Sequence, residues 1–239
     1  MNEIIERIFR SGCVEDAQGN VHNHTSASIT YETGVLLYDF IRTFKPEKTL
    51  EIGLAYGIST LFICQAHRDN GAGSHTAIDP FQEDSFKSIG LLNLERANLK
   101  DLFRFHQAPS DEVLPQFFRQ KKSFDFAFID GNHLFDFALV DFFYVDKLLS
   151  IGGKLAFDDL WMPGVRRVAS FVLKNKPYKL VHAPSKYPTP IWKRVLRTGR
   201  RVLQDPLGRD WVLKFLPHNV AFFKKVAADS RDWNFHRSF

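Results

Sequence analysis

The sequence predicts an α/β protein with a doubly wound, mostly parallel, seven-stranded sheet and helices on both faces. Seven short apolar runs predict strands, and amphipathic segments that predict helices separate most of them. Strands that alternate with helices favour a parallel sheet. Four of the first five predicted strands carry an acidic residue at or just after their C-terminal end. The chain has 239 residues, of which 44% are hydrophobic, enough for a full core.

The expected elements follow one another along the whole chain. The strands are expected at 49–52, 75–80, 102–106, 124–130, 154–157, 178–182 and 220–225. Helices are expected at 1–10, 33–44, 58–67, 84–99, from about 110, and at 134–149, 163–173 and 191–203. Pro46 ends the second helix, and Gly152-Gly153 is expected to break the helix that precedes it. Residues 11–28 are polar and turn-rich, which predicts a loop.

A glycine turn follows the first predicted strand. Gly53 and Gly57 form G-x-x-x-G just before the next helix begins. A strand, a glycine turn and a helix N-terminus let a nucleotide-like ligand lie against the backbone. The dinucleotide fingerprint is absent because Ala55 stands two residues after Gly53, and no phosphate-loop lysine follows. A strand-turn-helix without a ligand is the alternative.

Acidic residues mark the ends of several predicted strands. Asp79 stands 22 residues after Gly57, where nucleotide-binding α/β folds hold ribose hydroxyls; a turn before Pro80 is the alternative. Ligands bind beyond the carboxyl ends of parallel strands, and like charges gathered there require cations or hydrogen-bond donors. The acids expected at this edge are Glu51, Asp79, Asp130, Asp158 and Asp159. Capping of the next helix by Asp158 and Asp159, and a turn at Asp130, are the structural alternatives.

Charge is unevenly distributed along the chain. Residues 160–239 contain 17 Lys and Arg but four Asp and Glu, a net charge of +13, and residues 1–159 carry −8. The basic region could meet an anionic substrate, nucleic acid or a membrane surface, or form a solvated face. Cys13 and Cys64 are too few for a zinc motif or a disulfide framework. Without a signal-peptide pattern or an apolar run long enough to span a bilayer, we expect a cytoplasmic protein.

The ordered motifs resemble one enzyme family. They are Glu51-x-Gly53-x-x-x-Gly57-x-Ser59, Ile78-Asp79, Phe128-Ile129-Asp130-Gly131-Asn132-His133 and Gly152-Gly153-x-x-x-Phe157-Asp158-Asp159. The chain is similar to class I S-adenosylmethionine-dependent methyltransferases, and more narrowly to metal-dependent small-molecule O-methyltransferases of the catechol and caffeoyl-CoA type and their antibiotic-tailoring relatives. The likeness covers about residues 30–182 and the last strand. It implies a Rossmann-like sheet with an antiparallel last strand, and a single domain over 1–239 with a cap region at 1–30 and a basic insertion at 183–219.

The resemblance also implies roles for individual residues. The residues implied to bind S-adenosylmethionine are Glu51, Gly53, Tyr56, Gly57, Ser59, Asp79, Ser110 and Asp130. Mg²⁺ is implied at Asp130, Asp158 and Asp159, although the catechol type has Asn at the third position. Asp130 or His133 is implied to take the substrate proton, and His133 stands where the catechol enzymes have Lys.

The implied function is Mg²⁺-dependent O-methylation of a small-molecule hydroxyl, including one on an anionic acceptor. Two alternatives stay open: a metal-independent methyltransferase with His133 as base, and an RNA-binding or RNA-modifying protein that uses the basic end. Nucleic acid is the weaker interpretation because aromatic-basic RNA motifs are missing.

The basic insertion contains one amphipathic segment, 191–203. Ile191, Val195, Leu196 and Val202 are expected to face inward. The basic side chains expected to face outward or to the rim of the site are Lys193, Arg194, Arg197, Arg200 and Arg201. We expect a substrate lid; a homodimer contact and a peripheral contact with anionic lipid are the alternatives.

Overall fold

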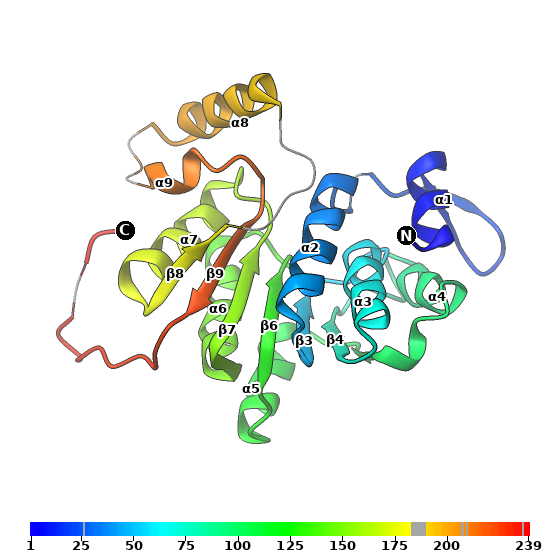
Figure 1. Cartoon of the computed structure of the whole chain (residues 1–239), viewed down its shortest axis with the longest axis horizontal. Coiled ribbons are helices and arrows are strands. Elements are labelled where there is room, and N and C mark those ends of the chain that lie inside the picture. The colour runs from blue at the N-terminus through cyan, green and yellow to red at the C-terminus, as the bar shows by residue number, and fades with distance from the viewer. Residues whose placement is uncertain (26, 183–189, 207, 209, 236) are drawn as a thin grey trace. The chain divides into compact units, whose positions relative to one another are not determined.

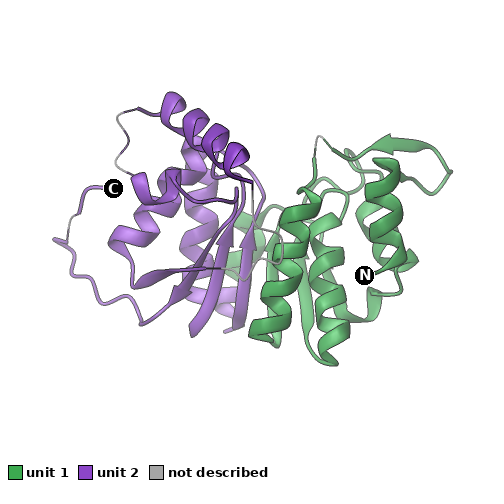
Figure 2. Ribbon diagram, turned by 45° about the horizontal axis from the view of Figure 1, so that its top comes forward, with its two compact units in different colours: residues 1–116, 183–186 green, residues 117–182, 187–239 purple. Residues whose placement is uncertain are grey.

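The computed structural model describes residues 1–25, 27–182, 190–206, 208, 210–235 and 237–239. Among these residues the chain divides into two compact units, Met1–Gln116 and the residues that follow (Figure 2). The part of the predicted insertion at 183–189, including Pro184 and Pro188, lies outside the described residues. No helix of the described chain is both long and apolar enough to cross a bilayer.

The sheet has seven strands, as predicted (Figure 1). Unit 1 contributes three parallel strands in the order β5 (Phe103–His106), β4 (Ser74–Ile78) and β3 (Lys48–Ile52). Unit 2 contributes β6 (Phe124–Ile129), β7 (Leu149–Phe157), β9 (Ala221–Lys225) and β8 (Tyr178–Val181), in that order. β6 and β7 are parallel, and β9 is antiparallel to both of its neighbours. The mostly parallel sheet with an antiparallel last strand is therefore confirmed.

Helices connect the strands of both units. In unit 1 they are α1 (Glu3–Ser11), α2 (Tyr31–Phe44), α3 (Ile58–Asn70), α4 (Ile89–Arg96) and the 3₁₀ turn η1 (Lys100–Leu102). α5 (Ser110–Arg119) contains the boundary between the units. Unit 2 contains α6 (Phe135–Leu148), α7 (Pro163–Asn175), α8 (Ile191–Gln204) and the short α9 (Trp211–Lys214). Their starts follow ordinary capping chemistry: the Thr30 hydroxyl accepts from the Thr33 amide at α2, and Pro163 opens α7.

In two segments of unit 1 the secondary structure differs from the prediction, because the hydrophobic pattern does not reveal the local contacts that determine it. The predicted loop at 11–28 contains a hairpin, β1 (Cys13–Glu15) and β2 (Val21–Asn23). Buried Asp16 holds its turn by accepting from the amides of Gln18 and Asn20, at 3.0 and 2.8 Å. The helix predicted at 84–99 begins later, at Ile89, because Lys87 and Ser88 adopt positive φ.

The glycine pair Gly152-Gly153 lies inside a strand rather than at a helix end. β7 begins at Leu149, earlier than predicted, and Gly152 adopts φ 88°. The β6–β7 register shifts between Phe124 and Phe126, so the extra residues form an irregularity in the ladder. Gly152 supplies the left-handed conformation that this irregularity requires.

The predicted orientation of the basic helix is wrong. Arg201, expected on the outside or at the rim, is fully buried, whereas Ile191, Val195 and Leu196, expected inside, are exposed. The buried side of α8 faces backbone carbonyls of residues 213–218, which guanidinium and hydroxyl groups can satisfy and aliphatic side chains cannot.

A chain of buried polar groups crosses the core of unit 1. Thr49 Oγ1 lies 2.9 Å from His67 Nε2 and 2.8 Å from His75 Nδ1, and His75 Nε2 lies 2.9 Å from Glu51 Oε2. Burial, together with the neighbouring His75, lowers the pKa of His67 from 6.5 to about 4. The fold therefore holds His67 neutral.

This burial predicts an acid-sensitive fold. A depressed histidine pKa contributes stability that is present above pH 6.5 and is lost as the pH falls towards about 4. We expect His67 to account for a loss of about 2 kcal/mol in the free energy of unfolding between neutral pH and about pH 5. In urea unfolding across this pH range, the free energy of unfolding should fall more steeply with decreasing pH in the wild type than in His67→Asn. Equal pH slopes in the two proteins would contradict the assignment.

Candidate functional site

The loop after β3 has the backbone conformation that the glycine motif predicted. Gly53 adopts φ 94° and Gly57 φ 75°, and even Ala55 has a positive φ of 45°. A Cβ on Gly57 would lie 2.9 Å from the carbonyl oxygen of Gly90, so only glycine fits there without displacing backbone. α3 begins directly after Gly57 without a side-chain cap. No capping side chain therefore accepts a hydrogen bond from the first amide groups of this helix.

Asp79 fixes this loop from the end of β4. Its Oδ2 accepts from the amides of Leu54 and Ala55, both at 2.8 Å, and its Oδ1 accepts from the amide of Phe81 at 2.7 Å. The carboxylate is buried, with 4% exposure. Asp79 thus determines the shape of the glycine loop, and its contact with a ribose stays a prediction.

Two amide side chains that the sequence analysis missed hold the other side of the loop. Gln82 Nε2 donates to the carbonyl of Ala55 at 2.7 Å, and Asn93 Nδ2 donates to that of Tyr56 at 3.0 Å. Both are buried. Both residues lie in the segment after β4. Only their proximity to the loop in the folded chain shows that they support it.

The other residues predicted to bind the cofactor occupy different environments in unit 1. Glu51 is fully buried and accepts from the Thr60 hydroxyl, so its carboxylate belongs to the core network. Ser59 is buried in the first turn of α3, and Tyr56 packs edge-on against Phe86 with ring centres 5.2 Å apart. Ser110 is half-buried and begins α5.

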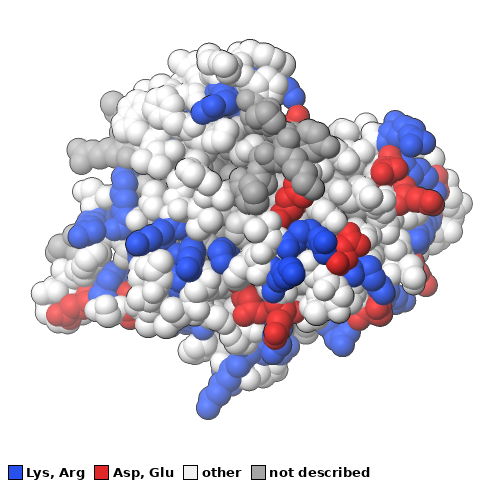
Figure 3. Space-filling view, viewed as in Figure 1, with Lys and Arg blue, Asp and Glu red and all other residues white. Residues whose placement is uncertain are grey.

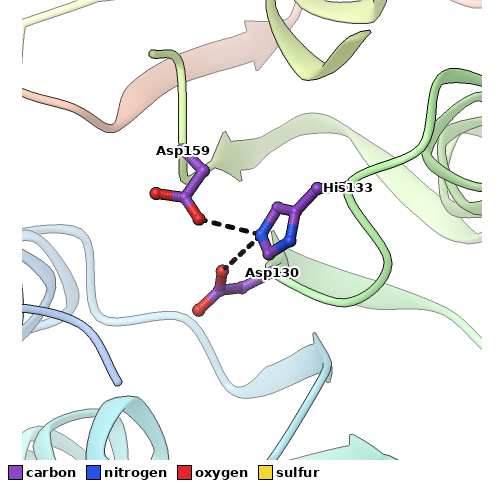
Figure 4. Close-up of side chains that lie close together, drawn as sticks. All are labelled: Asp130, His133 and Asp159. Atoms are coloured by element: carbon purple, nitrogen blue, oxygen red, sulfur yellow. Dashed lines mark ion pairs between the residues drawn. The ribbon is translucent and has the colours of Figure 1, made fainter. Parts of the chain in front are cut away.

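Two of the three acids predicted to bind metal, Asp130 and Asp159, come together with His133 in unit 2, whereas Asp158 is not part of this group of ligand atoms. Ile129 pairs with Phe157 in the parallel β6–β7 ladder, so Asp130 and Asp158 follow adjacent strand ends. Ligand atoms of Asp130, His133 and Asp159 all lie within 4.8 Å of one another (Figure 4). The adjacent strand ends thus bring these groups to one place, as expected for parallel neighbours.

His133 lies between two carboxylates. Its Nε2 is 3.6 Å from Asp130 Oδ1 and 2.9 Å from Asp159 Oδ2. The carboxylates of Asp130 and Asp159 raise the pKa of His133 from 6.5 to about 10, against the effect of burial. In this arrangement the ring carries a proton at neutral pH and balances part of the negative charge.

Asp159 is held by residues that the sequence analysis missed. Its Oδ1 accepts from Trp161 Nε1 at 2.7 Å and from Asn219 Nδ2 at 3.0 Å. Burial opposes its ionisation, but the contacts with His133, Trp161 and Asn219 outweigh burial and lower its pKa. Asp159 also adopts φ 50°, a backbone strain consistent with a functional position.

Asp158 has the least compensated carboxylate of the site. It is 6% exposed, and its Oδ1 has no hydrogen-bond partner in the described structure. Burial raises its pKa well above the usual value, and the charges of Asp130 and Asp159 raise it further. A buried carboxylate in this setting requires a proton or a cation.

Comparison with known proteins agrees with the motifs. Residues 50–160 match the model of a family described as a methyltransferase domain. The chain is 30% identical over 142 residues to a caffeoyl-CoA O-methyltransferase of Populus kitakamiensis, a match that covers 56% of each chain. The chain thus spans about half the length of this relative. The predicted resemblance to O-methyltransferases of the caffeoyl-CoA type is confirmed as a sequence similarity over this part of the chain.

Solved structures confirm the fold. An O-methyltransferase from Bacillus cereus in complex with SAH has a TM-score of 0.61 and 20% identity, covering 76% of this chain and 83% of that one. The O-methyltransferase TomG from Streptomyces achromogenes, solved in complex with SAM, has a TM-score of 0.59 and 20% identity, covering 76% and 82%.

Proposed function

We propose that this chain, which carries a methyltransferase domain over residues 50–160 on an O-methyltransferase fold, is an S-adenosylmethionine-dependent O-methyltransferase for a small-molecule hydroxyl and uses a divalent cation. The observation that carries the proposal is the cluster of Asp130, His133 and Asp159, with Asp158 beside it, at the ends of two adjacent parallel strands. Carboxylates gathered in this way are suited to a hard cation, which methyl transfer to an unactivated hydroxyl benefits from.

The glycine loop of unit 1 fits a nucleoside ligand that approaches backbone. Its glycines leave no Cβ between the backbone and a ligand, and the uncapped start of α3 offers amide donors. We infer that Gly53, Gly57 and Ser59 hold the cofactor, while Asp79 keeps the loop in the required conformation and Ser110 lines the adenine. When bound, S-adenosylmethionine supplies an electrophilic methyl group.

The donor set of unit 2 fits a divalent cation. The unpartnered Oδ1 of buried Asp158 lies beside the charges of Asp130 and Asp159, and a cation there would compensate negative charge. Asp130, Asp158 and Asp159 would hold the cation, and a bound cation makes a hydroxyl easier to deprotonate. If His133 gave up its proton in favour of a bound cation, its ring nitrogen would widen the choice beyond Mg²⁺ to metals that accept mixed oxygen and nitrogen ligands, such as Mn²⁺.

The side chains themselves then position the acceptor and its proton. Trp161 and Asn219 fix the Asp159 carboxylate, and Asp159 with Asp130 fixes the imidazole of His133. Asp130 or His133 would receive the hydroxyl proton at a carboxylate oxygen or at Nε2. His133 can accept the hydroxyl proton only after it has lost its own proton, which the neighbouring carboxylates stabilise. This argues against His133 as the base of a metal-free reaction.

Removal of divalent cations should therefore stop the reaction. We expect chelation to lower methyl transfer to caffeoyl-CoA and small catechols by at least about 100-fold, and added Mg²⁺ or Mn²⁺ to restore it. Release of S-adenosylhomocysteine from the full chain measures the rate. A thermal-shift series with Mn²⁺ supplies a readout independent of the acceptor, because binding stabilises the folded state.

The metal-free alternative predicts the opposite result. Activity that survives chelation and Asp158→Asn, but is lost in His133→Asn, would establish His133 as the base and refute the cation. Calorimetry with S-adenosylhomocysteine tests the wider proposal, which fails if the folded chain does not bind this product at millimolar concentration.

A further inference from the structure

α8 is an amphipathic helix whose apolar side faces solvent. The exposed apolar residues are Ile191, Trp192, Val195, Leu196 and Leu203. At 3.6 residues per turn, they fall within an arc of about 140° on one side of the helix. Ile191 is 78%, Leu196 64% and Leu203 83% exposed. This is the reverse of the arrangement that water favours for a surface helix.

The polar side of α8 is fixed to unit 2 by many hydrogen bonds. The fully buried Arg201 donates to the carbonyls of Leu216 at 2.8 Å and His218 at 2.7 Å. Arg197 donates to the carbonyl of Pro217 at 2.9 Å, and Thr198 to that of Lys214 at 3.3 Å. Turning the helix to bury its apolar side would leave the Arg201 guanidinium and these carbonyls to find new partners.

The segment beneath α8 is itself held by a buried ionic cluster. Lys214 Nζ lies 3.1 Å from Asp210 Oδ1, and Arg166 Nε donates to Asp210 Oδ2 at 2.5 Å. α9 packs against α8 and exposes Trp211 and Val212, and Phe215 directly after it is exposed too. In α8, α9 and the segment between them, charged groups are thus buried while apolar side chains are exposed.

The charge of this region indicates what covers the apolar side. The sequence contains no acidic residue between Asp159 and Asp205, a stretch with 11 Lys and Arg. Arg194 and Arg200 are exposed on α8 itself. Figure 3 shows a largely uncharged surface over α8, with basic groups beside it. A second copy of this chain docked through α8 would bring two such basic regions together, whereas an anionic surface would attract them.

We propose that α8 lies in the surface of an anionic phospholipid bilayer, with its apolar side among the acyl chains and its basic side chains at the headgroups. Amphipathic helices rich in Lys and Arg with Trp and Leu on the apolar side bind membranes in this way. Each basic group near such a surface adds to the attraction, and long basic side chains reach the headgroups while their stems stay apolar. The proposal goes beyond the methyltransferase activity and does not depend on it.

Flotation of the full chain with phospholipid vesicles tests the proposal. We expect the wild type to float with vesicles of phosphatidylcholine and phosphatidylserine, and to float poorly with phosphatidylcholine alone or at high salt. Leu196→Glu should weaken partitioning by about tenfold or more, because it removes a buried leucine and adds an acid beside anionic lipid. Tryptophan fluorescence should shift to the blue when vesicles are added. In Trp192→Phe this shift should be smaller, because the contribution of Trp192 is missing.

Ile151→Glu is the matched control. Ile151 is 65% exposed and lies in β7, so Ile151→Glu changes the charge by the same amount as Leu196→Glu and removes a similar exposed apolar side chain. This variant should float as the wild type does, and circular dichroism of both variants checks their folding. A wild type that stays in solution, or equal flotation of the two variants, would overturn the proposal. So would self-association without lipid that Leu196→Glu abolishes, because it would make a second copy the occupant.

Discussion

Asp79→Ala is expected to weaken binding of S-adenosylhomocysteine by at least about tenfold and to lower the free energy of unfolding by roughly 3 kcal/mol. The substitution removes the acceptor for three backbone amides, of which two belong to the glycine loop. Hydrogen bonds to a charged group contribute more than neutral ones, and buried donors without partners add a further cost. Calorimetry measures the affinity, and chemical denaturation measures the stability.

Two further variants separate the ways in which Asp79 could act. Asp84→Ala removes an exposed acid from the following turn and should change neither quantity. Asp79→Asn keeps an oxygen for the Leu54 and Ala55 amides. If Asn restores stability and affinity, Asp79 acts through the loop; if it restores stability alone, the carboxylate also contacts the ligand, as the sequence predicted. Wild-type affinity in Asp79→Ala would refute both roles.

Asp159→Ala is expected to lower methyl transfer by at least about 100-fold while leaving the affinity for S-adenosylhomocysteine within about twofold of the wild type. The variant removes the carboxylate nearest to His133, and it takes away the acceptor of Trp161 Nε1 and Asn219 Nδ2. The predicted cation would lose a ligand, and the imidazole would lose the group that orients it. The glycine loop belongs to unit 1 and should keep its conformation.

The control for this prediction is Asp136→Ala. Asp136 is an exposed acid in the first turn of α6, so this variant changes the net charge of unit 2 by the same amount. It should retain full activity. Activity above about a tenth of the wild type in Asp159→Ala would refute the assigned role of this carboxylate, because loss of a metal ligand or of the group that orients a catalytic residue costs more than that.

Hydrophobic patterning and strand-end acids determined much of the fold before any coordinates. An apolar run followed by Asp130, and another followed by Asp158-Asp159, place these acids together whenever the two strands are parallel neighbours, as the Ile129–Phe157 register makes them. The glycine motif likewise predicted the sharp turn after β3, because few residues other than glycine adopt φ near 75–94° readily. These features depend on contacts that are local or that follow from strand order.

The hairpin at 13–23 and the true start of β7 were not predictable in the same way. Strands of three residues are too short for an alternating pattern, and the turn of the hairpin is held by the buried side chain of Asp16. Gly152 predicted a helix end, but tertiary pairing placed it in an irregular strand.

What the sequence by itself determined is which residues share a strand end or a helix side: the acids of unit 2, the glycine turn and the amphipathic character of 191–204. Only the tertiary structure decided which partner each side meets. Asn219 reaches Asp159 from 60 positions further along the chain, and Glu51 turns into a buried network with Thr60 and His75. The physical reason is clearest at α8, where periodicity cannot distinguish inside from outside. Backbone carbonyls of residues 213–218 needed donors, Arg201 supplied them, and the apolar side was left facing outward.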